Sequence, residues 1–316
     1  MDISFIIVSW NTRQLLLDCL FSIRDTVKGF EYEVFVVDNG STDGSQQAVR
    51  EQYGAMAHLI ENTGNQGFAR ANNQAIKQAS GSYVILLNSD TVLRDSTVSG
   101  LIQFLEDNPG TAMAGPRMVG ADGKVQNSFD NFPTLATELL NKSLLRLLFP
   151  EQYAGKAKQA AGPFEVDSLI GACIAIRFTA IRRVGMLDED YFFFLEETDW
   201  CLRMRRAGFK IHHLPQVEIV HLQGRSKRHR PALSWIEYYR SLYHFFKKNR
   251  HAPTYYTLRV CRFVKLIINL VLTMVGLCLT LGAKSRYREK TIVYSRLLWW
   301  HLCLCPANVG LRNPKS

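Results

Sequence analysis

An aspartate stands at the end of an apolar run, where its carboxylate can meet a ligand. Residues 82–87 are apolar apart from the first, and they lead into Asn88-Ser89-Asp90. Such a run predicts a buried parallel strand, and open α/β sheets bind their ligands outside the carboxyl ends of these strands. Asp90 is therefore a candidate ligand for a cation that carries a diphosphate. Taken alone, it is better explained as the cap of a helix beginning near Asp95 or as the end of a turn.

Two earlier segments share this design, in which an apolar strand runs into a polar loop and then into a helical pattern. Residues 3–8 lead into Ser9-Trp10-Asn11, and residues 34–37 lead into Asp38-Asn39-Gly40. This alternation predicts a parallel sheet. Because βαβ crossovers are right-handed, the three loops at Asn11, Asp38 and Asp90 are expected at one edge of the sheet, where they can share a ligand.

The second loop also carries candidate helix caps. Ser41 or Thr42 is expected to cap the helix that follows, and Asp43 is interpreted as a capping residue rather than a ligand contact.

Five polar motifs follow one another along the chain. They are Val8-Ser9-Trp10-Asn11, residues 37–45 beginning Val37-Asp38-Asn39-Gly40, residues 62–69 ending Gln66-Gly67-Phe68-Ala69, Asn88-Ser89-Asp90-Thr91, and Phe194-Leu195-Glu196-Glu197-Thr198-Asp199. Together they resemble the motifs of glycosyltransferase family 2, with the strongest likeness to rhamnosyltransferases of cell-surface polysaccharide synthesis. The resemblance covers residues 2–250, and the ordered set is far more specific than any single motif.

The resemblance implies an α/β fold of the GT-A type, with a Rossmann-like mixed sheet flanked by helices, and a reaction that inverts the anomeric carbon. It also implies a nucleotide-sugar donor, dTDP- or UDP-linked, with these residues around it: Ser9, Asn11, Asp38, Gly67, Asn73, Asn88 and Asp90. The N3–H group of a pyrimidine base can donate a hydrogen bond to an ionised carboxylate. Asp38 is therefore interpreted as the residue that reads the base, rather than as an Asx turn with Gly40.

A departing diphosphate gathers negative charge, which a divalent cation held by hard oxygen ligands stabilises. We therefore expect Mg²⁺ or Mn²⁺, with Asp90 as a ligand. Many relatives carry Asp-x-Asp, whereas the first position here is Asn88, at most a neutral oxygen donor or a sugar contact. The family pattern points to His221, which ends Val217-Glu218-Ile219-Val220-His221, as the second ligand. The other seven histidines are interpreted as structural.

Inverting transfer needs a base that takes the proton of the acceptor hydroxyl. The resemblance assigns this role to Glu197, where glutamate replaces the more common aspartate and lengthens the reach by one methylene. Glu196 remains open as an alternative. Asp199 is either an acceptor contact or an acid favoured by the positive end of a helix. Gly171, in the small-residue segment 168–173, is expected to meet the acceptor through its backbone.

Charge and cysteine content indicate which partners and which cellular compartment to expect. The chain has 38 Lys and Arg against 28 Asp and Glu, a net charge of +10 that suits anionic surfaces, and no nucleic acid is expected as a partner. Its seven scattered cysteines show no metal-ligand spacing and are expected to be reduced thiols in the cytosol. Residues 3–8 are too short for a signal peptide.

The last part of the chain predicts membrane attachment. Residues 266–283 are almost wholly apolar and just long enough to span a bilayer, and residues 292–304 form a second apolar stretch. Basic residues flank the first stretch on both sides. We prefer a helical hairpin lying in the inner leaflet to a true span, and to a helix buried against the rest of the protein. The expected location is the cytoplasmic face of the inner (cell) membrane.

Two domains are predicted, a GT-A catalytic domain over residues 1–250 and a helical membrane-associated segment over residues 251–316. The basic residues of 225–230 are either a loop that closes over phosphate or a solvated charge run.

These features predict a metal-dependent, inverting glycosyltransferase that moves a sugar, with rhamnose favoured, to an oligosaccharide or lipid-linked acceptor. Two alternatives remain open. A nucleotidyltransferase would show a glycine-rich phosphate loop after its first strand, and Ser9-Trp10-Asn11-Thr12 is not one. A non-catalytic basic membrane scaffold would use the same charge without needing the acidic motifs.

Overall fold

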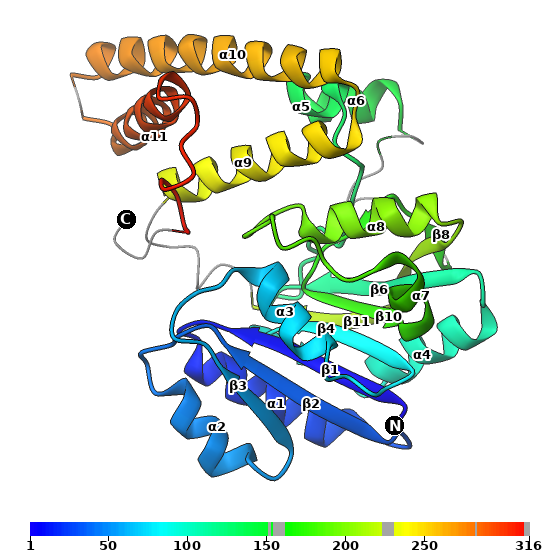
Figure 1. Ribbon diagram of the computed structural model, residues 1–316. Coiled ribbons are helices and arrows are strands. Elements are labelled where there is room, and N and C mark those ends of the chain that lie inside the picture. The colour runs from blue at the N-terminus through cyan, green and yellow to red at the C-terminus, as the bar shows by residue number, and fades with distance from the viewer. Residues whose placement is uncertain (151–152, 154–161, 223–230, 282, 313–316) are drawn as a thin grey trace.

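The computed structural model describes residues 1–150, 153, 162–222, 231–281 and 283–312 (Figure 1). The basic run at 225–230 lies outside these residues. Nine strands form one mixed sheet whose main path runs in the order β3-β2-β1-β4-β10-β6-β11-β5, while β8 pairs with β11. The strands are β1 (Ile3–Ser9), β2 (Tyr32–Asp38), β3 (Ala57–Glu61), β4 (Tyr83–Asn88), β5 (Thr91–Leu93), β6 (Thr111–Val119), β8 (Phe164–Glu165), β10 (Cys173–Arg177) and β11 (Lys210–His221).

Helices cover both faces of this sheet, as Figure 1 shows. On one face lie α1 (Arg13–Thr26), α2 (Ser45–Tyr53) and α4 (Thr97–Asp107). On the other lie α3 (Phe68–Ile76), α7 (Phe178–Val184) and α8 (Glu196–Arg206). This three-layer arrangement confirms the predicted mixed α/β sheet flanked by helices.

The apolar runs identified in the sequence are strands that are buried on both faces. In β2, Val34 and Val36 join one hydrophobic cluster, while Phe35 and Val37 join the cluster on the opposite face. Successive side chains point to opposite faces of a strand, so a strand between two helical layers is apolar throughout. Helix α8 also begins at Glu196, where the sequence predicted it.

The predicted common edge is present. Strands β1, β2 and β4 are parallel, and their register places Ser9 opposite Asp38 and Val8 opposite Asn88. The loops that follow the three strands therefore emerge side by side. Strand β11 reaches the same edge through β5, because His221 lies opposite Thr91, one residue beyond Asp90.

A second, two-stranded sheet lies between the main sheet and the chain's last helices. It pairs β7 (Phe129–Asp130) with β9 (Ser168–Leu169), and the segment between them carries α5 (Leu135–Leu139) and α6 (Lys142–Leu148).

The last three helices pack on one another above the catalytic layers (Figure 1). They are α9 (Pro231–Asn249), α10 (Ala252–Leu279) and α11 (Ser285–Leu302). Leu242 of α9, Leu258 of α10 and Trp300 of α11 belong to the same buried cluster. The proposed domain boundary near residue 250 thus falls inside a shared hydrophobic core, so truncation there would expose the inner face of α9. By length and composition, α10 is able to cross a membrane.

Candidate active site

The two residues predicted to ligate a cation face each other at the sheet edge. Oδ1 of Asp90 lies 3.4 Å from Nε2 of His221, and both side chains are nearly buried. Asp90 occupies the turn between β4 and β5, and His221 ends β11. Helix α4 begins after Ser96, so Asp90 does not cap it. A carboxylate oxygen and an imidazole nitrogen at this separation fit a shared divalent cation.

Gln126 orients the histidine and was not found by sequence reasoning. Its Nε2 donates to the carbonyl oxygen of His221, across 2.9 Å, and its Oε1 lies 2.9 Å from Nδ1 of the same residue. Because a carbonyl oxygen only accepts, this contact fixes the amide, and Oε1 must accept from an Nδ1–H group. The lone pair of a neutral ring is then on Nε2, facing Asp90. A metal-ligating histidine needs this tautomer.

Asp38 is fully buried at the end of β2. Its Oδ2 accepts from the backbone N–H of Ser41 at 2.8 Å and from Nε2 of Gln46 at 2.7 Å. Within the described part of the chain, its Oδ1 has no hydrogen-bond partner. A buried acceptor of this kind is costly unless a ligand donor meets it.

The loops after β1 and β2 brace each other through Asn11, which adopts a left-handed conformation with φ of 54°. Its N–H donates to Oγ of Ser41, and its Oδ1 accepts from the N–H of Thr42, each at 2.8 Å. The prediction that Ser41 or Thr42 caps α2 was therefore wrong. The N-cap of α2 is Gly44, and Asp43, one residue earlier, accepts from the N–H of Ser45 at 3.1 Å and from that of Arg13 at 2.8 Å, so it links the starts of α2 and α1.

The remaining residues predicted to bind the nucleotide sugar are not equally accessible. Ser9 is fully buried, and its hydroxyl is hydrogen-bonded to that of Thr12. Asn73 is also buried; its side-chain amide donates to the carbonyl oxygen of Leu187 and accepts from the N–H of the same residue. These contacts favour structural roles for Ser9 and Asn73. Asn88 is partly exposed at the end of β4, two residues before Asp90.

Gly67 holds the start of α3 against the segment that precedes α8. It has φ of 85°, and a Cβ atom there would lie 2.6 Å from the carbonyl oxygen of Phe192. The N–H of Phe68 donates to that oxygen at 2.8 Å. Only glycine tolerates both the conformation and the contact. The segments around Gly67 and Phe192 are therefore joined directly.

The predicted base, Glu197, is half-buried in the first turn of α8. Its Oε1 accepts a hydrogen bond from the backbone N–H of Gly171, across 3.2 Å. The residue expected to touch the acceptor thus also holds the carboxylate expected to take its proton. Two consecutive left-handed residues, Phe194 with φ of 75° and Leu195 with φ of 66°, set the entry into the helix. Such conformations cost about 1–3 kcal/mol each and cluster at functional sites.

Glu196 faces the interior, unlike its neighbour. Only 3% of it is exposed, and burial raises the pKa of its carboxyl well above the usual range, with the Glu197 and Glu237 carboxylates adding to the effect. A protonated acid that solvent cannot reach is a poor base for an acceptor hydroxyl. The geometry therefore favours Glu197 over Glu196.

Asp199 is fully buried and its carboxylate is occupied by the protein itself. Oδ2 accepts from Arg203 at 2.8 Å and Lys248 at 2.9 Å, and Oδ1 accepts from Asn249 at 2.9 Å. We therefore assign Asp199 a structural role, which joins α8 to the end of α9. The predicted acceptor contact has no support in this geometry.

A second group of possible cation ligands lies close to this network. Ligand atoms of Asp188, Asp190 and His244 fall within 4.8 Å of one another. Burial opposes ionisation of Asp188, but hydrogen bonds from Lys248 and His244 outweigh it and lower its pKa to about 2. The ammonium group of Lys248, 2.6 Å away, already neutralises this carboxylate. The group is best described as an ion-pair network between the segment before α8 and α9.

Cys173, the one cysteine in the small-residue segment, is buried in β10. Burial raises the pKa of its thiol far above the usual range, which keeps the sulfur protonated and unreactive. The expected packing role fits this environment.

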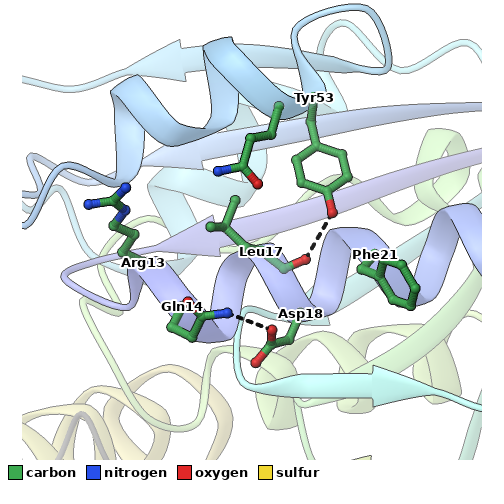
Figure 2. Close-up of a pocket in the computed structure, with 7 residues that line it drawn as sticks. Arg13, Gln14, Leu17, Asp18, Phe21 and Tyr53 are labelled. Carbon is green, nitrogen blue, oxygen red and sulfur yellow. Dashed lines mark hydrogen bonds between the residues drawn. The ribbon is translucent and has the colours of Figure 1, made fainter.

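A cavity of about 430 Å³ lies away from these residues, between α1 and α2 (Figure 2). Its lining residues are Arg13, Gln14, Leu17, Asp18, Phe21, Gln52 and Tyr53. Figure 2 shows two internal hydrogen bonds in this lining, from Gln14 to Asp18 and from Tyr53 to the carbonyl of Leu17. The cavity does not reach Asp38, Asp90 or Glu197.

Comparisons with known proteins agree with this geometry. Residues 4–185 match the model of glycosyl transferase family 2. The N-acetylglucosaminyl-diphospho-decaprenol L-rhamnosyltransferase of Mycobacterium tuberculosis is 28% identical over 246 residues, which cover 72% of this chain and 79% of the relative. The dTDP-rhamnosyl transferase RfbF of Shigella flexneri is 24% identical over 226 residues, 71% of this chain and 70% of the relative.

Solved structures show the same fold. The mannosyltransferase PcManGT from Pyrobaculum calidifontis, in complex with GDP-Man and Mn²⁺, superposes with a TM-score of 0.57 at 17% identity and covers 95% of this chain and 86% of its own. GalNAc-T7 with UDP, GalNAc and Mn²⁺ gives a TM-score of 0.54 at 16% identity, over 70% of this chain and 44% of its own. The predicted GT-A type fold is confirmed, and the chain belongs to glycosyl transferase family 2, close to rhamnosyltransferases.

Proposed function

We propose that this glycosyltransferase is metal-dependent and inverting, and that it transfers rhamnose from a dTDP- or UDP-linked donor. The single observation that carries the proposal is the pairing of Asp90 and His221, 3.4 Å apart, at the edge where β1, β2 and β4 end. The named activities of the two rhamnosyltransferase relatives support the choice of sugar.

The donor is held by its base and its diphosphate. The free Oδ1 of Asp38 accepts the N3–H of uracil or thymine, a ring donor that adenine and cytosine lack. A bound Mg²⁺ or Mn²⁺, ligated by Asp90 and His221, would neutralise charge on the diphosphate as the glycosidic bond breaks. Asn88 adds a neutral amide beside this site.

Glu197 acts on the acceptor. Its carboxylate takes the proton of the acceptor hydroxyl while that oxygen bonds to the anomeric carbon, and the bond to the diphosphate breaks on the opposite face. The hydrogen bond from Gly171 holds Oε1 and so orients the carboxylate that receives the proton. Attack from the opposite face inverts the anomeric configuration.

The proposed acceptor is a saccharide attached to a lipid, presented at the cytoplasmic face of the cell membrane. The apolar face of α10 and the lipid-linked substrate in the name of the mycobacterial relative support this assignment. Helix α10 is attached along one side to α5, α9 and α11, so lipid cannot surround it in this arrangement. An interfacial helix fits this geometry better than a membrane span.

The experiment is a donor panel. The purified full-length protein is incubated with dTDP-rhamnose, UDP-glucose, UDP-N-acetylglucosamine and GDP-mannose, each with Mg²⁺, Mn²⁺ or EDTA, and release of the nucleoside diphosphate is measured. We expect release from dTDP-rhamnose that EDTA abolishes and that a lipid-linked saccharide stimulates. Release that is unaffected by EDTA would contradict the cation site, and a preference for GDP-mannose would contradict the proposed dTDP- or UDP-linked donor.

A further inference from the structure

Helix α6 presents an apolar face to solvent, although it belongs to the catalytic part of the chain. Leu144, Leu147 and Leu148 are 50%, 78% and 59% exposed, and Phe149 directly after the helix is 52% exposed. Only Leu145 points inward. Single exposed leucines are ordinary, but a contiguous group of this size marks an interaction surface.

Helix α6 is drawn next to α5 below one end of α10 in Figure 1, and α5 contacts α10. Glu138 of α5 pairs with Arg262 of α10, and both side chains are largely buried. A second contact joins the same two helices, because Nζ of Lys265 in α10 donates to the carbonyl oxygen of Leu139 in α5, 3.4 Å away. The segment that carries α6 is therefore fastened to α10 by charge and by backbone contact.

Helix α10 is itself two-faced. Its inner side buries Leu258, Leu266 and Thr273, and its outer side exposes apolar residues at helical spacing along its whole length. These are Val260, Val264, Ile267, Ile268, Val271, Leu272, Val275 and Leu279, which are 40–81% exposed. A stripe at this spacing is one continuous apolar face.

Cations accompany both apolar faces. Arg146 lies on α6, Lys142 at its start pairs with Asp130 at 3.1 Å, and residues 139–150 contain no acid. In residues 251–316, Glu289 is the only acid against ten Lys and Arg. Cations beside apolar residues fit the headgroup region of an anionic bilayer. A second copy of this chain, also at +10, would instead bring like charges together.

We infer that α6 is a second membrane-binding element, which inserts Leu144, Leu147, Leu148 and Phe149 into the same anionic leaflet that receives the outer face of α10. The inference extends the proposed membrane attachment from the chain's last helices to its catalytic part.

Helix α6 is connected to the proposed base through a short chain of contacts. Lys142 of α6 bonds to Asp130 of β7 at 3.1 Å, and Asp130 lies opposite Ser168 of β9. Three residues further on, Gly171 bonds to the base Glu197. The leaflet contact is therefore one strand pair away from the residues that meet the acceptor, and it sets the height of the active site above the headgroups.

Hydrogen exchange on the full-length protein tests the inference without any substitution. Vesicles of phosphatidylcholine with one third phosphatidylglycerol are added, and exchange is followed by mass spectrometry. Peptides within 140–149 and within 260–279 should both become protected, while peptides of α1 should not change. Protection in 260–279 alone would overturn the role of α6. Protection of 140–149 that rises with protein concentration in the absence of vesicles would assign the face to a second copy, and would also overturn it.

A charged double variant then measures the contribution. Leu147→Glu with Leu148→Glu should weaken sedimentation with the anionic vesicles on the order of tenfold, because two apolar groups are lost and two anions are added. Phe21→Glu, at a half-exposed position on α1, is the matched control and should bind as the native chain does. Equal binding by all three proteins would overturn the inference. Neither readout uses catalysis, so a failure of the proposed sugar transfer leaves both results interpretable.

Discussion

The backbone N–H of Gly171 and the carboxylate of Glu197 meet across 3.2 Å, although 26 residues separate them in the chain. A Cβ atom at position 171 would lie 3.3 Å from the same carboxylate oxygen. The contact joins the small-residue segment before β10 to the first turn of α8. It therefore places the proposed base relative to the sheet that holds the donor.

Replacing this glycine should disturb catalysis more than folding. Gly171→Ala pushes the Glu197 carboxylate by a few tenths of an ångström, and small displacements of a reacting group can lower turnover by up to about a hundredfold. Nucleoside diphosphate binding and the melting temperature should stay close to native. Steady-state kinetics and calorimetry separate these effects, and an unchanged kcat would show that the carboxylate tolerates the shift.

The choice of base is tested by a pair of amide variants. Glu197→Gln should lower kcat by on the order of a hundredfold or more, because the amide cannot take a proton. Glu196→Gln should keep most of the activity, since that carboxyl is buried and its raised pKa disfavours the charged form that a base needs. Single-turnover rates with saturating donor make the comparison. The reverse ranking would move the base to Glu196.

The cation site is tested by removing each ligand. Asp90→Asn should weaken metal-dependent binding of the nucleoside diphosphate, and His221→Ala should do so less severely, because the aspartate supplies the only negative charge of the pair. Titration calorimetry with and without Mn²⁺ measures the difference. Metal dependence that survives in both variants would rule out this site.

Gln126 should matter through the orientation of His221 alone. Gln126→Leu removes the acceptor that holds Nδ1–H, and losses of this kind typically lower metal affinity by about 10–100-fold. Gln126→Glu keeps the acceptor for Nδ1–H but loses the donor to the His221 carbonyl, so its affinity should fall between those of the native chain and Gln126→Leu. Mn²⁺ binding followed by electron paramagnetic resonance gives the two constants. If both variants bind Mn²⁺ as the native chain does, Gln126 does not orient the ligand.

The buried Glu196 carboxyl should make stability depend on pH. Its pKa in the folded state is raised above the ordinary value of 4.5, so above that pH the folded state binds more protons than the unfolded state. This contribution is fully present below pH 4.5 and is lost as the pH rises through the raised pKa. Glu196→Gln should therefore gain stability relative to the native chain between pH 5 and pH 8. Urea unfolding of both proteins at pH 5 and at pH 8 measures this gain. A difference in unfolding free energy between variant and native chain that is the same at both pH values would contradict a buried acid at position 196.

The strands and their shared edge follow from the sequence, because apolar runs bounded by polar loops permit few other arrangements. The pairing of Asp90 with His221 follows from the family motifs once that edge is known. Neither the apolar runs nor the family motifs show which single polar residues are buried. Ser9, Asn73 and Asp199 were expected to touch substrate, yet each is buried and bonded within the protein.

Gln126 and the left-handed pair at 194–195 have no sequence signal. Gln126 lies in a connection between β6 and β7 and reaches His221 only because β6 and β11 are neighbours. Phe and Leu are among the residues least suited to positive φ, so local preference argues against the conformation that the structure adopts there. Both features depend on tertiary contacts that a pattern along the chain does not contain.

The contact between Gly67 and Phe192 has a mechanical consequence. Donor-side and acceptor-side segments are locked at a spacing that leaves no room for a methyl group. A substitution of Gly67 would therefore have to move one of the two segments. The spacing of these two segments is therefore fixed by folding and does not have to be set when a substrate binds.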